Sequence, residues 1–273
     1  MIFFLGMVFF LIGSFVGSFL NVVILRYNTG RGVVNSYSGC LSCGKRLQWF
    51  ELVPILSFFL QRGRCRGCQT PISWQYPLVE LMSGVLFLAV LWKFDFALTV
   101  WAEIGLVLVI FSILVVIGVY DIRHKIIPDG FVFTFIVLSF ISLFMSGNTL
   151  FSWSVFSWGA LWSGPLLFAP FALLWIISRG RWIGFGDAKF AWGMGWFLGG
   201  VLGFSALILA FWSGAVVAVM LLFISRFTRK SSTHRFLITM KSEVPFAPFL
   251  IISTILVYLF EWDVVGLSKL LAL

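Results

Sequence analysis

Residues 101–129 read WAEIGLVLVIFSILVVIGVYDIRHKIIPD, and this stretch decides the fold class. An apolar run of about 20 residues is long enough to cross the hydrocarbon core of a bilayer as a helix. The run ends at Asp121, and Arg123 and Lys125 follow almost at once. Basic residues collect in the loops on the cytoplasmic side of membrane helices. The stretch therefore predicts a membrane span whose C-terminal end lies at the cytoplasmic face.

Similar apolar runs recur along the whole chain. Of the 273 residues, 61% are hydrophobic and only 11% are charged, whereas a soluble domain has about 25% charged residues. We predict an all-α polytopic membrane protein with about eight transmembrane helices. The expected spans are residues 2–25, 76–92, 100–120, 129–146, 152–178, 188–206, 207–225 and 244–261. For the glycine-rich region 188–225, a re-entrant hairpin is the alternative to two short spans.

The distribution of basic residues predicts the orientation in the membrane. Among the 19 Lys and Arg residues, all except Lys93 and Lys269 fall in four loops, at residues 26–66, 123–125, 179–189 and 226–241. The positive-inside rule places these loops in the cytoplasm and both termini outside. No basic residue precedes Arg26, so we expect the first run to stay as a membrane helix. The net charge of +9 then reflects topology, and nucleic acid is not an expected partner.

All four cysteines lie in the loop between the first two spans, in two C-x2-C pairs: Cys40, Cys43, Cys65 and Cys68. Two residues between thiols let one tight turn offer two sulfurs to one metal, and four thiolates form a tetrahedral site that usually holds zinc. Two disulfides are the alternative, which a reducing cytoplasm disfavours. Four protein ligands leave no position for water, so we predict a structural zinc ion. The expected organisation is a first helix at 1–26, a zinc-binding loop module at 27–75 and a helical bundle at 76–273.

Ionisable side chains next to membrane spans are costly and are therefore functional candidates. Four of them matter for function: Glu80, Asp121, Asp129 and Asp187. The three aspartates all lie at the predicted cytoplasmic face. Two carboxylates that share one proton can activate water against a peptide bond, one as the base and the other as the acid. An aspartic hydrolase is therefore one interpretation of these residues.

Each candidate also has a purely structural interpretation. Asp129 follows Pro128, and both residue types favour the first turn of a helix. Asp187 could be the N-cap of a helix starting at Ala188. Asp121 opposes the helix dipole at a C-terminal end, which makes a structural role harder to assign. Glu80 could satisfy a polar partner inside the bundle or bind substrate.

The order of short motifs along the chain resembles the type IV prepilin peptidases. The matching segments are Gly17–Ile24 followed by Arg26, the paired C-x-x-C loop, Tyr76–Glu80, Asp121 with Ile127–Asp129, Gly184–Asp187 followed by Lys189, and Pro245–Leu250. The segment Gly184–Asp187 matches the GxGD motif of that family. Six such segments occur in the expected order, and together they extend over nearly the whole length of the chain.

This resemblance implies a specific activity. It implies that Asp121 and Asp187 are the catalytic pair, with supporting or substrate-binding roles for Glu80, Asp129, Gly184, Gly186 and Lys189. It also implies a membrane aspartic endopeptidase of the bacterial inner membrane. Such an enzyme removes the short basic leader of prepilins, or of the pseudopilins of type II secretion, at the cytoplasmic face. Methylation of the new N-terminus with S-adenosylmethionine is implied by the resemblance only, since the sequence lacks a strand-borne G-x-G motif.

Two alternatives remain open at the level of the sequence. A presenilin-type intramembrane protease shares the GxGD motif but lacks the long four-cysteine loop. A non-enzymatic transporter predicts inverted repeats and charges near the middle of the membrane, whereas the aspartates here lie at one face. A zinc metalloprotease is disfavoured because the chain has no H-E-x-x-H motif.

Overall fold

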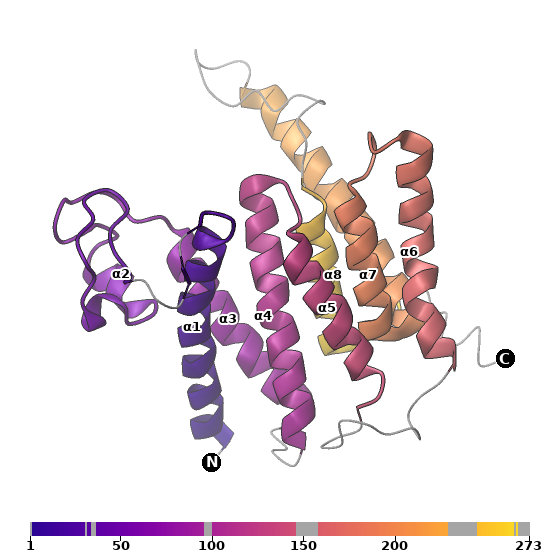
Figure 1. The fold of residues 1–273 in the computed structure, drawn as a ribbon, viewed down its shortest axis with the longest axis horizontal. Helices are drawn as coiled ribbons and strands as arrows, with labels where there is room; N and C mark the ends of the chain where they lie inside the picture. Colours follow the sequence, from indigo (N-terminus) through magenta and orange to yellow (C-terminus); the bar gives the residue numbers. More distant parts are fainter. Residues whose placement is uncertain are drawn as a thin grey trace. The chain divides into compact units, whose positions relative to one another are not determined.

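The protein is helical throughout the part that this computed structural model describes, which is residues 2–30, 32–33, 37–95, 100–145, 158–228, 245–264 and 266, without the side chains of 225–228. The helices are α1 (Ile2–Arg26), the short 3-10 helix η1 (Trp49–Glu51), α2 (Leu56–Leu60), α3 (Gln75–Lys93), α4 (Trp101–His124), α5 (Asp129–Ser142), α6 (Trp158–Ser178), α7 (Phe185–Thr228) and α8 (Ala247–Phe260) (Figure 1). No β-strand forms within these ranges. The predicted all-α class is therefore confirmed.

Five of these helices, namely α1, α3, α4, α6 and α7, are long and apolar enough to cross a membrane. The two shorter apolar helices are α5 and α8. The exact number of crossings stays a prediction. The beginning of the expected span 152–178 and the basic loop residues Arg229, Lys230, Arg235 and Lys241 lie outside the described residues, as do Arg31 and Lys269.

The chain divides into two compact units. The N-terminal unit contains α1, the cysteine loop, α3 and α4 up to Val119. Its two first membrane helices pack closely because α1 presents glycine where α3 crosses it. A Cβ added at Gly13 or Gly17 would lie within 3 Å of atoms of Ser83, Phe87 or Glu80. Small residues spaced four apart are a common way for membrane helices to approach each other.

The C-terminal unit contains the end of α4 together with α5, α6, α7 and α8. Aromatic side chains fill its interior. Phe135 of α5 stacks on Phe190 of α7 with ring centroids 5.1 Å apart, and both side chains are fully buried. Ser163 of α6 donates a hydrogen bond to the carbonyl oxygen of Gly195 in α7, at 2.6 Å. Helix α7 is thus held from two sides.

Helix α7 reverses its direction at Gly199, where φ is 79° and ψ is 174°. A residue with a side chain rarely adopts this conformation. A Cβ built on Gly203 lies only 3.7 Å from the Cα of Gly195, whereas eight residues of straight helix span about 12 Å. The region 188–225 therefore contains two antiparallel helical segments, as predicted. The expected boundary between residues 206 and 207 is wrong, because the chain turns at the glycine.

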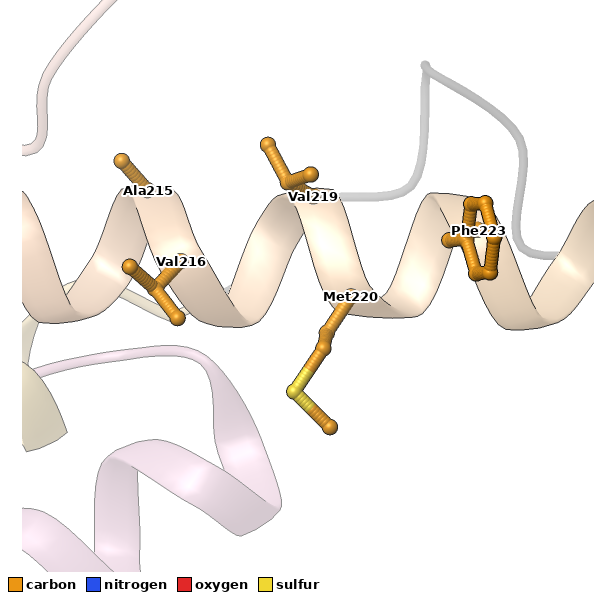
Figure 2. Close-up of a pocket in the computed structure, with 5 residues that line it drawn as sticks. All are labelled: Ala215, Val216, Val219, Met220 and Phe223. Carbon is orange, nitrogen blue, oxygen red and sulfur yellow. The ribbon is translucent and has the colours of Figure 1, made fainter.

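The second half of α7 carries a shallow hollow lined by Ala215, Val216, Val219, Met220 and Phe223 (Figure 2). All five side chains consist of carbon and hydrogen except for the thioether of Met220. The larger ones are exposed, with Val219 at 66% and Phe223 at 63% of their full accessibility. A helix surface of this kind is typical of contact with lipid chains.

Candidate functional site

The cysteine loop contains two turns of the same design. The amide of Cys40 donates to the carbonyl of Lys45, and the amide of Cys65 donates to the carbonyl of Thr70. In each turn the amide of the fourth following residue, Gly44 or Gln69, donates back to the cysteine carbonyl. Both of these residues adopt a positive φ. This shared geometry directs the two thiols of each pair to one side.

The four sulfur atoms lie together, all within 4.8 Å of one another. The Sγ atoms of Cys40 and Cys68 are 3.8 Å apart. A tetrahedral site with metal–sulfur bonds of about 2.3 Å places its sulfurs about 3.8 Å from each other. The cluster that the spacing predicted is therefore confirmed, and its donor set fits a thiolate-bound metal. The identity of the metal stays a prediction.

A buried carboxylate stabilises this module beside the sulfur cluster. Glu51 is only 6% exposed, accepts a hydrogen bond from the amide of Gln48 at 2.9 Å and forms an ion pair with Lys45 at 3.1 Å. These contacts lower the pKa of Glu51, with the backbone hydrogen bond from Gln48 as the largest cause. The sequence analysis missed Glu51, although its position three residues after Gln48, the N-cap of η1, is a capping-box pattern.

Glu80, a candidate for a supporting role, belongs to the N-terminal unit. It is buried in α3 and accepts a hydrogen bond from the backbone amide of Ile55 at 2.7 Å. Ile55 has a positive φ of 62°, which is rare and strained for a β-branched residue. The carboxylate thus holds an unusual turn of the loop against a membrane helix. The sequence left two interpretations of Glu80 open, a polar partner inside the bundle or a role in binding substrate. The structure shows a polar partner, the amide of Ile55.

Asp121 lies in the last turns of α4, which continues to His124. Its side chain is only 4% exposed, and its Oδ2 atom has no hydrogen-bond partner among the described residues. Lys125, with a positive φ of 54°, ends the helix by donating its amide to the carbonyl of Asp121 at 2.7 Å. A buried carboxylate oxygen without a partner is unusual in a stable core and marks Asp121 as a candidate functional group.

Asp187 lies in the first turn of α7, which begins at Phe185. The N-cap interpretation of Asp187 is therefore wrong, because the helix starts before this residue and not after it. Asp187 is 9% exposed, and its amide donates to the carbonyl of Gly184 at 3.2 Å. A carboxylate in a first turn is compatible with the helix dipole, so the buried charge is partly compensated by the backbone.

The corner between α4 and α5 meets the start of α7 inside the C-terminal unit. The charge of Asp121 acts on the carboxyl group of Asp187, so the two side chains lie within electrostatic reach. Ile127 in the corner packs so closely on Gly186 that a Cβ added there would lie 2.9 Å from the Cβ of Ile127. Two buried carboxyl groups that repel each other favour a shared proton, which is the state an aspartic hydrolase uses.

Asp129 and Lys189 provide a second contact between the same elements. Asp129 is the first residue of α5, as the helix-start interpretation predicted, and its side chain forms an ion pair with Lys189 of α7. Lys189 also lies over the rings of Phe133 and Phe185, at 5.4 and 5.2 Å from their centroids. The carboxylate of Asp129 is 64% exposed. Its surroundings therefore differ from those of the two buried aspartates.

Of the two candidate glycines, only Gly186 is in a close contact. A Cβ added at Gly184 would meet no atom nearer than the Oδ2 of Asp187, at 3.5 Å. The sequence analysis also missed Ile127 as a site residue. A signal was present, because Ile127 precedes Pro128 directly, and the residue before a proline is held extended.

Two family models match the chain. The Bacterial Peptidase A24 N-terminal domain covers residues 11–94, and the Type IV leader peptidase family covers residues 108–219. The first match includes the cysteine loop and Glu80. The second includes Asp121, Asp129, Gly186 and Asp187.

Relatives with the name prepilin leader peptidase/N-methyltransferase extend these matches. The protein of Myxococcus xanthus is 35% identical over 217 residues, which cover 78% of this chain and 62% of the relative. The protein of Burkholderia pseudomallei is 30% identical over 272 residues, which cover 88% of this chain and 80% of the relative. The protein of Bacillus subtilis is 29% identical, with 97% and 98% covered. No solved structure matches this chain.

Proposed function

Since this chain belongs to the type IV leader peptidase family, we propose that it cleaves the leader from prepilin-type precursors by an aspartic mechanism. The observation that carries the mechanism is the pair Asp121 and Asp187, both buried and within electrostatic reach of each other. Asp121 lies on α4 and Asp187 on α7, and both belong to the C-terminal unit. We assign the catalytic roles to these two side chains.

The proposed reaction needs only the two carboxyl groups and water. The ionised carboxylate takes a proton from a water molecule while the water oxygen bonds to the scissile carbonyl carbon. The protonated carboxyl group donates a hydrogen bond and then its proton to the carbonyl oxygen. The carbon–nitrogen bond breaks when the carbonyl re-forms and the leaving amine takes up a proton. The Oδ2 atom of Asp121 has no hydrogen-bond partner among the described residues and is therefore able to accept a hydrogen bond from this water.

The proposed location is the cytoplasmic face of the bacterial inner membrane. The positive-inside rule supports this orientation for the loop that carries the cysteines and for the corner at Arg123 and Lys125. Prepilin-type substrates, with a basic leader before an apolar helix, fit an enzyme whose carboxylates lie at the ends of apolar helices. The match of residues 11–94 to the A24 N-terminal domain favours this substrate class over that of a presenilin-type protease.

Zinc is the metal that we propose for the four cysteines. When bound, it joins the two turns of the loop and supplies no chemistry to hydrolysis. The names of the relatives also lead us to propose N-methylation of the processed product with S-adenosylmethionine. The described residues do not fit a recognisable cofactor cradle, because they contain no strand-borne glycine-rich loop. No residue of this chain is assigned to that step.

The test of the aspartic mechanism is cleavage of a prepilin-type precursor in membranes that contain the full chain. We expect Asp121→Asn and Asp187→Asn each to abolish cleavage while the protein still assembles and keeps its zinc. Normal cleavage by either assembled variant would show that the altered residue is not catalytic. Mass spectrometry of the processed product tests methylation separately, since a product that never gains a methyl group contradicts that part of the proposal alone.

A further inference from the structure

The short helix α2 exposes an apolar surface that the rest of the N-terminal unit does not cover. Its residue Phe58 is buried, whereas Leu56, Phe59 and Leu60 are exposed at 56%, 59% and 66%. Exposing this much apolar surface to water from a five-residue helix is unfavourable. The surface therefore requires a covering partner.

The contacts of α2 show where this surface lies along the membrane helices. Trp74 precedes α3 directly, and its ring packs against those of Phe58 and Phe59, with centroids 4.8 and 6.5 Å apart. Trp74 is 62% exposed. Tryptophan at the end of a membrane helix is typical of the layer between lipid chains and headgroups. The exposed surface of α2 thus lies next to the point where α3 enters the membrane.

The hydrogen bond from Ile55 to Glu80 indicates how deep the surface of α2 lies in the bilayer. Glu80 follows Gln75, the first residue of α3, by five positions, which corresponds to about 7.5 Å along the helix. Helix α3 has 19 residues, close to the roughly 20 that span the hydrocarbon core, so crossing the bilayer places Glu80 inside it. The chain around Ile55, and α2 after it, is held at this level. Figure 1 accordingly shows α2 level with the C-terminal turns of α1 and not beyond the end of that helix.

The charges next to α2 identify the partner more closely. Arg62 and Arg64 lie two and four residues after the end of α2, and both are exposed. Apolar side chains that insert below the headgroups, next to basic side chains that remain among them, are typical of interfacial membrane anchors. The combination is less suited to a soluble protein partner, because the apolar surface already lies at the depth of the lipid.

We propose that α2, together with Trp74, Arg62 and Arg64, forms an interfacial anchor that binds the bilayer and its anionic lipid headgroups. The anchor holds the four-cysteine module against the membrane surface. The module then has two attachments to the membrane, one through Glu80 inside α3 and one through lipid. This inference does not depend on the proposed peptidase activity.

The first test measures contact with lipid directly. The full chain is reconstituted in vesicles of phosphatidylcholine and phosphatidylglycerol with a photoreactive side chain introduced as Phe59→p-benzoylphenylalanine. The matched control is Trp49→p-benzoylphenylalanine, because Trp49 is an aromatic residue of the same module with 79% exposure and no ring contact with Trp74 among those the structure describes. We expect several-fold more lipid adduct at position 59 than at position 49.

Equal adduct yields at the two positions, or cross-links from position 59 to protein instead of lipid, would overturn the proposal. The zinc content of each variant shows whether its module is folded. The second test compares vesicles of phosphatidylcholine alone with the mixed vesicles. The yield at position 59 should rise with phosphatidylglycerol, and the combined substitutions Arg62→Gln and Arg64→Gln should remove that rise. A rise that persists without both arginines contradicts their assigned role.

Discussion

The four-cysteine module and the aspartate pair bring their ionisable side chains together in different ways. In the module, each pair of thiols comes from one short turn, and the hydrogen bonds of that turn lie within it. In the aspartate pair, Asp121 lies in the last turn of one helix and Asp187 in the first turn of another, and only the packing of the C-terminal unit brings them together. The first geometry is local and the second is tertiary. Changes to the packing of the C-terminal unit should therefore affect hydrolysis and leave metal binding intact. Changes to the cysteine turns should affect metal binding far more than hydrolysis.

The largest expected effect is a loss of cleavage without any loss of bound zinc. The single substitutions Asp121→Asn and Asp187→Asn should each reduce the rate of cleavage by at least about 10³-fold, and the double variant should be no slower than the singles, because residues that act as a unit are not additive. Zinc content should stay at the wild-type level. The measurement is single-turnover cleavage in membranes. Additive losses would mean that the two carboxyl groups act independently.

The complementary change removes a thiol. Cys40→Ser should weaken zinc binding by more than the roughly 100-fold that the loss of a second-shell partner costs, because one of the four ligands is gone. Competition with a chromophoric chelator measures this, with Ser42→Ala in the same turn as the control. Cleavage should fall far less than in the aspartate variants. A loss of cleavage as complete as theirs would show that the module takes part in hydrolysis.

A packing change at the aspartate site should have a smaller effect. Gly186→Ala brings a Cβ within 2.9 Å of Ile127 and should push the corner after α4 away from α7. A misplacement of about 1 Å can cost about 100-fold in rate. The control is Gly184→Ala, whose added Cβ meets no atom closer than 3.5 Å. Kinetics in which the two alanine variants are indistinguishable would contradict the importance of this contact.

The pH dependence of the module should follow Glu51. Its pKa is lowered in the folded state, so its contribution to stability is present above the unfolded pKa of about 4.3 and is lost as the pH falls through the lower, folded pKa. Glu51→Gln should therefore destabilise the module by about 1–3 kcal/mol at neutral pH. Hydrogen exchange of the loop amides measures the difference from wild type. A difference that grows toward acidic pH would show that the sign is wrong.

The smallest effect is expected at Asp129. Its carboxylate is 64% exposed, and exposed ion pairs contribute at most about 1 kcal/mol. Asp129→Asn should therefore change cleavage by less than about fivefold, although its ion-pair partner Lys189 lies only two residues after Asp187. The same cleavage assay provides the measurement. A loss as large as that of Asp187→Asn would move Asp129 into the catalytic machinery.

What could be predicted from the sequence follows the same division between local and tertiary geometry. The thiol cluster was predictable because its spacing is local, and the apolar runs predicted most helices to within a few residues. The start of α5 at Asp129 was predictable from Pro128. These features depend on neighbours in the chain.

Other features depend on contacts between distant segments and could not be predicted. The hydrogen bond between Ile55 and Glu80 requires the loop to fold back onto α3. The turn at Gly199 could not be assigned because several other glycines surround it, and only the packing selects one of them. The start of α7 before Asp187 was missed as well, and the close packing of Gly186 on Ile127 at this start is a contact between distant segments.

The reversal at Gly199 also bears on how the chain enters the membrane during synthesis. The segment of α7 before it is about 21 Å long at 1.5 Å per residue, shorter than a bilayer core of about 30 Å. It is too short for the insertion machinery to release as a separate span. No charged residue occurs between Lys189 and Arg226, so the hairpin carries no charge across the bilayer. The two segments should therefore partition into lipid together, in one step that is insensitive to the membrane potential.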